Sequence, residues 1–328
     1  MGHAGRQDVE SEERGAGGDD NALMSQSASS RAAVLSGTAF ATLLLIAFMM
    51  GANHVAARMA FDNGVDVATA VSFRSGVTAV VVSLLLVVQR VPVRLNARHR
   101  RALPAIGLLV GVQSLCLYSS VARLPVALAL LAFNTYPLWT ALWARLAYRH
   151  RPERRVLVAM PVMLLGLALA LDVLGAASGL GAAAQWDRIG AGVAFALGGA
   201  ATFGLALVLT QHEAGDLDGR LRTATTMGMV ALIALAGVTT QGGFRLPQAA
   251  AGWWGLLTLT FLYGTAFTIM FTVLPRLGVV GNSAIMNVEP IFALVLAWAI
   301  LGQSIATSQV AGGLLVVATV MWLGLRRR

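Results

Sequence analysis

Lysine is absent from this chain of 328 residues, and all 24 of its basic residues are arginine. Charged residues of any kind are scarce at 12%, about half the share that is usual in soluble domains, whereas 57% of the residues are hydrophobic. Apolar runs long enough to cross a bilayer recur along most of the chain. The composition therefore excludes an ordinary soluble domain and predicts an all-α membrane protein that spans the bilayer many times.

Cysteine occurs once, at Cys116 in an apolar run, so a single chain can form neither a disulfide nor a thiolate metal cluster. Several enzyme signatures are also missing. There is no G-x-S-x-G elbow and no phosphate-binding P-loop, and His212-Glu213 lacks the second histidine of a zinc-binding helix. We expect no enzyme activity, no ATP-driven pumping, no cofactor and no metal.

The net charge of +9 reflects topology rather than a nucleic-acid surface. The arginines cluster in alternate connections between apolar runs, with nineteen on one side of the predicted membrane and three on the other. By the positive-inside rule, both termini are predicted to be cytoplasmic. We expect a multi-pass protein of the cell (inner) membrane whose partners are the lipid bilayer and a small molecule. A homodimer is one open alternative for its assembly.

Ten apolar segments follow a polar tail at residues 1–34, which has the composition of a disordered segment. A Gly/Ala-rich linker at 174–188 divides the rest into two five-helix halves, 35–173 and 189–328. The ten predicted spans are 36–59, 67–89, 102–122, 125–147, 155–173, 189–211, 222–241, 251–274, 280–301 and 305–325.

The two halves share an internal repeat displaced by 153 residues. An odd number of spans per half means that the halves must insert with opposite orientations. Inverted repeats are typical of secondary transporters, whose substrate site lies near mid-membrane between the repeats. The matching residues are Gly51 with Gly204, Val55 with Val208, Gly111 with Gly264, Arg123-Leu124 with Arg276-Leu277, Asn134 with Asn287, and Pro137 with Pro290.

Four stretches also resemble the drug/metabolite transporter superfamily, in particular its EamA-type ten-helix permeases, over about residues 36–325. The stretches are GANHVAARMAF at 51–61, SFRSGVTAV at 72–80, ALLAFNTYPLWTALWA at 129–144 and NVEPIFALVLAWAILGQ at 287–303.

The resemblance implies export or uptake of small metabolites such as amino acids, nucleosides or drugs. Gly51, Arg74, Pro137 and Glu289-Pro290 match the positions of family features. His54 departs from the small or apolar residue that is more usual there, and Gln303 replaces a common glutamate. Both departures bear on substrate choice rather than on the fold.

Glu289 is the strongest functional candidate. A carboxylate deep in a span costs about 2.5–3.5 kcal/mol on insertion scales, so it is expected to face a wet cavity or a partner. Pro290 follows directly and is expected to kink the helix and loosen backbone polar groups. We predict proton coupling at Glu289, and a structural acid bonded to a neighbouring helix is the alternative.

Arg74 lies about seven residues inside the second span. It is expected to pair with Glu289, to bind an anionic substrate group, or to reach the outer surface with its long side chain. His54 is a candidate second proton site, and its alternative is a hydrogen-bonded packing residue. The candidate substrate-binding residues, each of which has helix packing as its alternative, are Asn53, His54, Arg74, Gln113, Tyr118, Asn134, Tyr136, Trp139, Tyr263, Asn287 and Glu289.

The sequence thus favours a secondary-active transporter for a small metabolite or drug-like solute, with alternating access of two repeats. An amino-acid-like solute and export are the preferred details. A passive channel and a membrane receptor or scaffold are the rival classes. A channel is expected to show a ring of like charges, and a receptor is expected to have an output domain.

Overall fold

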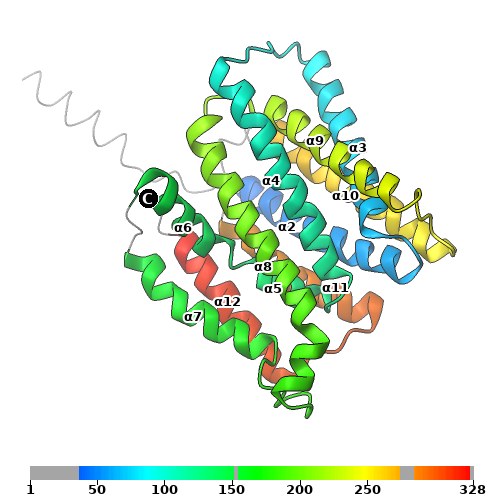
Figure 1. Cartoon of the computed structure of the whole chain (residues 1–328), viewed down its shortest axis with the longest axis vertical. Coiled ribbons are helices and arrows are strands. Elements are labelled where there is room, and N and C mark those ends of the chain that lie inside the picture. The colour runs from blue at the N-terminus through cyan, green and yellow to red at the C-terminus, as the bar shows by residue number, and fades with distance from the viewer. Residues whose placement is uncertain (1–36, 151–153, 274–283, 326–328) are drawn as a thin grey trace, which may run out of the picture. The chain divides into compact units, whose positions relative to one another are not determined.

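The computed structural model describes residues 37–150, 154–273 and 284–325, and every regular element within them is helical. The tail predicted for residues 1–34 lies outside the described residues, as does the repeat block that includes Arg276. The elements (Figure 1) are α2 (Gly37–Asp62), α3 (Val67–Val88), α4 (Ala97–Val121), α5 (Val126–Phe133), α6 (Tyr136–Tyr148), α7 (Arg154–Ala170), α8 (Ala182–Glu213), α9 (Gly219–Thr240), α10 (Ala250–Thr272), the 3-10 helix η2 (Ala284–Val288), α11 (Glu289–Leu301) and α12 (Thr307–Leu325).

Seven helical segments in the described residues are long and apolar enough to cross a membrane, where α5 and α6 count together as one segment. Three shorter apolar helices accompany them, at Val156–Ala170, Glu289–Leu301 and Thr307–Trp322. The expectation of an all-helical, multi-spanning chain is therefore confirmed. The count of ten spans and the cytoplasmic position of both termini stay predictions.

The prolines of the fourth and ninth segments do not kink a continuous helix, which corrects the expectation at Pro290. Each segment is instead broken into two pieces, and the proline occupies the first turn of the second piece. A proline is tolerated there because the amide hydrogens of a first turn have no partner within the helix. The break places Glu289 at the N-terminus of α11, where the helix dipole stabilises a negative charge.

The structure also differs from the predicted linker at 174–188, because α8 begins at Ala182. The run of three alanines that opens α8 has high helix propensity, and this extends the helix beyond its apolar span. Before it, Gly175, Gly179 and Gly181 adopt positive φ angles of 66°, 71° and 77°, which end the connection from α7.

The displacement of 153 residues recurs in the helix packing. A Cβ atom on Gly51 of α2 would lie 3.1 Å from the backbone nitrogen of Ala293 in α11. A Cβ atom on Gly204 of α8 would lie 2.8 Å from the backbone nitrogen of Thr140 in α6. Gly51 and Gly204 are 153 residues apart, and so are Thr140 and Ala293. The two halves therefore share one packing motif, in which a glycine permits two helices to approach closely.

Helices that correspond to each other in the two halves also pack together. α3 packs along α9, and α7 packs along α12, as Figure 1 shows. Near the start of α3, the hydroxyl of Thr69 accepts a hydrogen bond from the backbone of Arg245, which follows α9. At the other end, Gln89 bonds Arg220 at the start of α9. α3 and α9 therefore run antiparallel, as two related halves of opposite direction require.

Candidate functional site

His54 and Glu289 form the centre of the polar cluster. His54 Nε2 lies 3.2 Å from Glu289 Oε1, and the exposed fractions of the two side chains are 4% and 23%. The Gly51 contact described above brings α2 close to the start of α11, and His54 follows Gly51 by about one helical turn. The glycine thus allows a residue of the first half to reach the acid of the second.

Tyr118 of α4 joins this pair to the rest of the cluster. Its hydroxyl donates a hydrogen bond of 3.0 Å to Asn53 Oδ1, and its ring centroid lies 5.5 Å from that of His54. Tyr118 and Asn53 are fully buried. Neighbouring residues of α2 therefore contact both a carboxylate and a tyrosine.

Arg74 of α3 lies on the same tyrosine. Its guanidinium carbon is 4.3 Å from the ring centroid of Tyr118 and 4.1 Å from that of Tyr263 in α10. Only 3% of Arg74 is exposed. The predicted pairing of Arg74 with Glu289 is not observed, because the acid pairs with His54 and no carboxylate of the described residues forms an ion pair with Arg74.

Three buried nitrogen atoms of this cluster have no hydrogen-bond partner among the described residues. They are Nδ2 of Asn53, Nδ1 of His54 and Nε of Arg74. Buried polar atoms are nearly always bonded, and each exception calls for an explanation such as a bound water or ligand. Six predicted site residues thus share one cluster that contains unbonded buried nitrogen atoms: Asn53, His54, Arg74, Tyr118, Tyr263 and Glu289.

A second contact joins the two helix breaks. The hydroxyl of Tyr136, at the start of α6, lies 3.4 Å from Oδ1 of Asn287 in η2. The Tyr136 ring also packs against Phe203 of α8 with a centroid distance of 5.2 Å. Tyr136 and Glu289 are counterparts at the 153-residue displacement, so equivalent positions of the two halves hold an aromatic and an acid.

The structure does not bring the remaining three candidates into these contacts. Gln113 is buried on α4, and its backbone oxygen faces Gly199 of α8. Asn134 ends α5, and its buried Nδ2 has no partner among the described residues. Trp139 borders the close approach at Gly204. Packing explains Gln113 and Trp139, whereas the free amide of Asn134 keeps it as a candidate.

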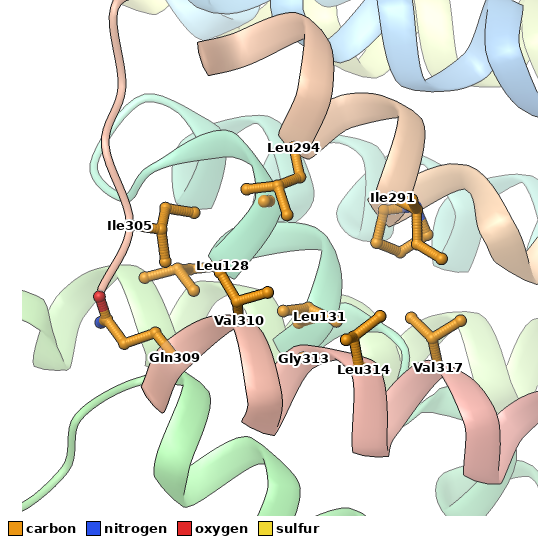
Figure 2. A pocket seen from close by; sticks show the side chains of 12 residues that line it. Leu128, Leu131, Ile291, Leu294, Ile305, Gln309, Val310, Gly313, Leu314 and Val317 are labelled. Carbon is orange, nitrogen blue, oxygen red and sulfur yellow. The ribbon is translucent and has the colours of Figure 1, made fainter. Parts of the chain in front are cut away.

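An apolar pocket lies beside the broken ninth segment but is separate from the polar cluster. Figure 2 shows Leu128 and Leu131 of α5, Leu294 of α11, and Val310 and Leu314 of α12 around it. Its polar side chain, Gln309, already accepts a hydrogen bond from the backbone of Ala306. This pocket therefore offers apolar contact rather than the charged groups that a polar solute requires.

Loop contacts connect the halves at both ends of the α3–α9 pair. At one end, Asp216 Oδ1 lies 3.0 Å from His99 Nε2 and 2.9 Å from Arg98 Nη2. The hydrogen bond from His99, aided by the charge of Arg98, lowers the pKa of Asp216. At the other end, the backbone nitrogen of Gln248 donates to the carbonyl oxygen of Asn63 over 3.0 Å. This end also has a longer ion pair, with Arg245 Nε 4.0 Å from Asp66 Oδ2, so the closer ion pairs are those of Asp216.

The model of the EamA-like transporter family matches this chain twice, over residues 37–171 and 190–325. The matched residues make up most of the chain. The chain belongs to the EamA-like transporter family. The resemblance noted in the sequence is therefore confirmed, and so is the layout of two repeats.

A solved crystal structure of another protein shares the fold of this EamA-like chain, with a TM-score of 0.55. It is 17% identical, and the alignment covers 85% of this chain and 96% of the other. No curated protein matches. Family membership identifies a multi-pass membrane protein of a transporter family rather than of an enzyme family, with a lipid bilayer and a small solute as its partners.

Two residues near the cluster were not among the sequence candidates. The ring of Phe203 packs on that of Tyr136. The sulfur of Met227 in α9 lies 3.7 Å from the hydroxyl oxygen of Tyr263. Phe203 directly precedes Gly204, so the repeat offered a signal for it. Met227 occupies an ordinary apolar position in α9, and nothing in the sequence distinguishes it from other packing residues.

Proposed function

We propose that this EamA-like chain is a secondary-active transporter that moves a small, amino-acid-like solute out of the cell in exchange for protons. Its ten spans would form two inverted five-helix repeats in the inner membrane, with both termini cytoplasmic. The antiparallel packing of α3 with α9 supports the inverted arrangement.

One observation carries the proton step. The carboxylate of Glu289 and the imidazole of His54 are 3.2 Å apart in a buried site that both halves contribute to. A carboxylate and an imidazole at this distance can hold a proton between them in a charge-assisted hydrogen bond. Solute binding near the pair can then displace a proton, and this makes the two binding events compete.

The position of this pair supports alternating access. α2 carries His54 and belongs to the first repeat, whereas α11 carries Glu289 and belongs to the second. A rocking motion of one repeat against the other would change the contact between the two residues. Proton release and solute uptake would therefore be linked to the same movement.

Counterflow in proteoliposomes tests this function. The wild-type protein is expected to exchange a labelled member of an amino-acid and metabolite panel with a rate that depends on pH. Glu289→Gln is expected to abolish the pH dependence, because the amide has a similar shape but does not titrate in this range. The measurement is the rate of exchange at several pH values in parallel preparations.

Glu213→Gln is the matched control, because Glu213 bonds the hydroxyl of Tyr148 at the end of α8 and lies outside the cluster. It should retain the wild-type pH profile. A Glu289→Gln variant with full transport and full pH dependence would exclude proton coupling at this residue. Passive flux without counterflow would favour a channel instead.

A further inference from the structure

The guanidinium of Arg74 is a buried cation that lies against two aromatic rings. The rings of Tyr118 and Tyr263 stabilise its charge through cation–π contacts at 4.3 and 4.1 Å. Ring faces accept no conventional hydrogen bonds. The two tyrosines therefore compensate part of the charge, and the Tyr118 hydroxyl also interacts with the guanidinium, but Nε has no acceptor among the described residues.

The Nε atom shows this need directly, since it is buried and has no hydrogen-bond partner among the described residues. Glu289, the acid of the polar cluster, already pairs with His54. Leaving a buried cation without an acceptor is costly, which is why such groups are normally paired. Among the described residues no carboxylate forms an ion pair with Arg74, so the site has room for an anion from a ligand.

The tyrosines also limit what that anion can be. Each of the two rings is supported independently, Tyr118 through Asn53 and Tyr263 through a contact of its hydroxyl with Met227. Both rings contact the guanidinium at its central carbon, and the unbonded Nε–H leaves that edge of the group for a ligand. The geometry that suits the Nε–H and a neighbouring Nη–H is a planar group with two acceptor oxygens, and a carboxylate has this geometry.

From these contacts we infer that Arg74 is the receptor for a carboxylate of the transported solute, held in position by Tyr118 and Tyr263. This inference rests on the proposed transport function and names the chemical class of its substrate. The carboxylate binds the edge of Arg74, and the rest of the solute extends toward His54 and Glu289. The solute is either a zwitterion, whose ammonium group approaches Glu289, or a simple monoanion.

Matched probes distinguish these solutes. For a small, a branched and an aromatic side chain, the test compares the amino acid, the carboxylic acid without its amino group, and the amino-acid amide. Binding is measured as the rise in melting temperature of the detergent-solubilised full chain, and transport as counterflow. Probes with a carboxylate are expected to stabilise the protein and to exchange, whereas the amides are not.

Substitution of Arg74 gives the second arm. Arg74→Gln should weaken binding of the carboxylate probes by roughly 10- to 100-fold, the range expected for losing a charge-assisted pair. Arg74→Lys keeps the charge but not the two-pronged geometry and should give an intermediate loss. Arg123→Gln, which removes an exposed arginine that lies over the ring of Phe195, should bind like the wild type.

The outcomes separate the inference from the function that it depends on. If the amides bind and exchange as well as the carboxylates, or if Arg74→Gln retains carboxylate-induced stabilisation, the inference is wrong while transport stands. If Arg74→Gln fails to fold, the inference is tested by Arg74→Lys and by the comparison of carboxylate and amide probes on the wild type. If no probe binds to or exchanges on folded wild-type protein, both the amino-acid-like function and the inference are rejected.

Discussion

At Gly204, a single hydrogen atom in place of a side chain sets how closely two helices approach. A Cβ atom there would lie 2.8 Å from the backbone nitrogen of Thr140 and 2.9 Å from Cβ of Trp139. Backbone atoms cannot rotate away as a flexible side chain can. The glycine is therefore required by packing, since its own backbone has ordinary helical geometry.

Gly204→Ala is accordingly expected to destabilise the protein by about 1–3 kcal/mol, the usual cost of overpacking. Its counterpart Gly51→Ala meets contacts of 3.0–3.3 Å and should cost less. The measurement is thermal unfolding in detergent. Gly76→Ala is the control, because a Cβ atom on that glycine of α3 meets nothing within 4 Å. Equal melting temperatures for all three variants would contradict the packing role.

The charged residues of the cluster differ in how far the sequence predicted them. Glu289 and Arg74 were identifiable because charged side chains inside apolar runs are rare and costly. Their partners were not identifiable, because the pairing of Glu289 with His54 rather than Arg74 depends on the rotation of three helices. Helical spacing along one segment contains no information about that rotation.

At the scale of the elements, the connection between α8 and α9 forms an ionic contact with the start of α4. Asp216 lies within 3.0 Å of both His99 and Arg98, and the α3–α9 pair is linked nearby through Gln89 and Arg220. The connection at the opposite end combines a backbone bond between Asn63 and Gln248 with an ion pair of 4.0 Å between Asp66 and the exposed Arg245. A long ion pair with an exposed partner contributes little to stability. Acid should therefore weaken the first end more than the second.

The sign of this effect follows from the pKa of Asp216, which its partners lower. Such a carboxylate stabilises the fold fully above the ordinary aspartate pKa of about 3.9, and this contribution disappears as the pH falls through the lowered value. Wild-type melting temperature should therefore decline below about pH 4. The Asp216→Asn variant should have a lower melting temperature than the wild type at neutral pH. Its melting temperature should then fall less on acidification, because the titrating carboxylate is gone.

Melting curves between about pH 3 and 7 in detergent would check this expectation, and Asp187→Asn provides the comparison. Asp187 lies near the start of α8 and forms no ion pair among the described residues, so its substitution should leave the pH profile unchanged. An acid-induced decline in Asp216→Asn identical to that of the wild type would show that the contact does not contribute.

For the whole molecule, the arginine distribution and the helix packing together predict how the two repeats are oriented in the membrane. The arginine distribution predicts that the connection after α3 is cytoplasmic and that the connection after α9 is on the outside. Because α3 and α9 pack antiparallel, their C-terminal ends lie on opposite sides of the membrane. The packing therefore agrees with the predicted positions of the two connections. Arg94 and Gln241 are exposed residues of the two connections.

Cysteine labelling tests this orientation in a Cys116→Ala background. Arg94→Cys should resist a membrane-impermeant maleimide in intact cells and react after the membrane is opened. Gln241→Cys should react in intact cells. Both proteins should be labelled to the same extent in detergent, which shows that each cysteine is accessible. Labelling of both positions in intact cells would be incompatible with the inverted repeats.

The sequence by itself determined the class of this protein. The apolar runs and the scarcity of charge require a bilayer, and the 153-residue displacement revealed the two repeats, because both properties are written along the chain. The family match, over 37–171 and 190–325, agrees with both.

Only the tertiary structure decided which polar groups meet. It broke two predicted helices at prolines, paired Glu289 with His54, and left Arg74 between two tyrosines with an unused donor. These outcomes depend on how close α2 and α11 approach and on how each helix is rotated. The approach of the helices and their rotation are set by contacts between residues more than 200 positions apart. The hydropathy of one segment contains no information about such contacts.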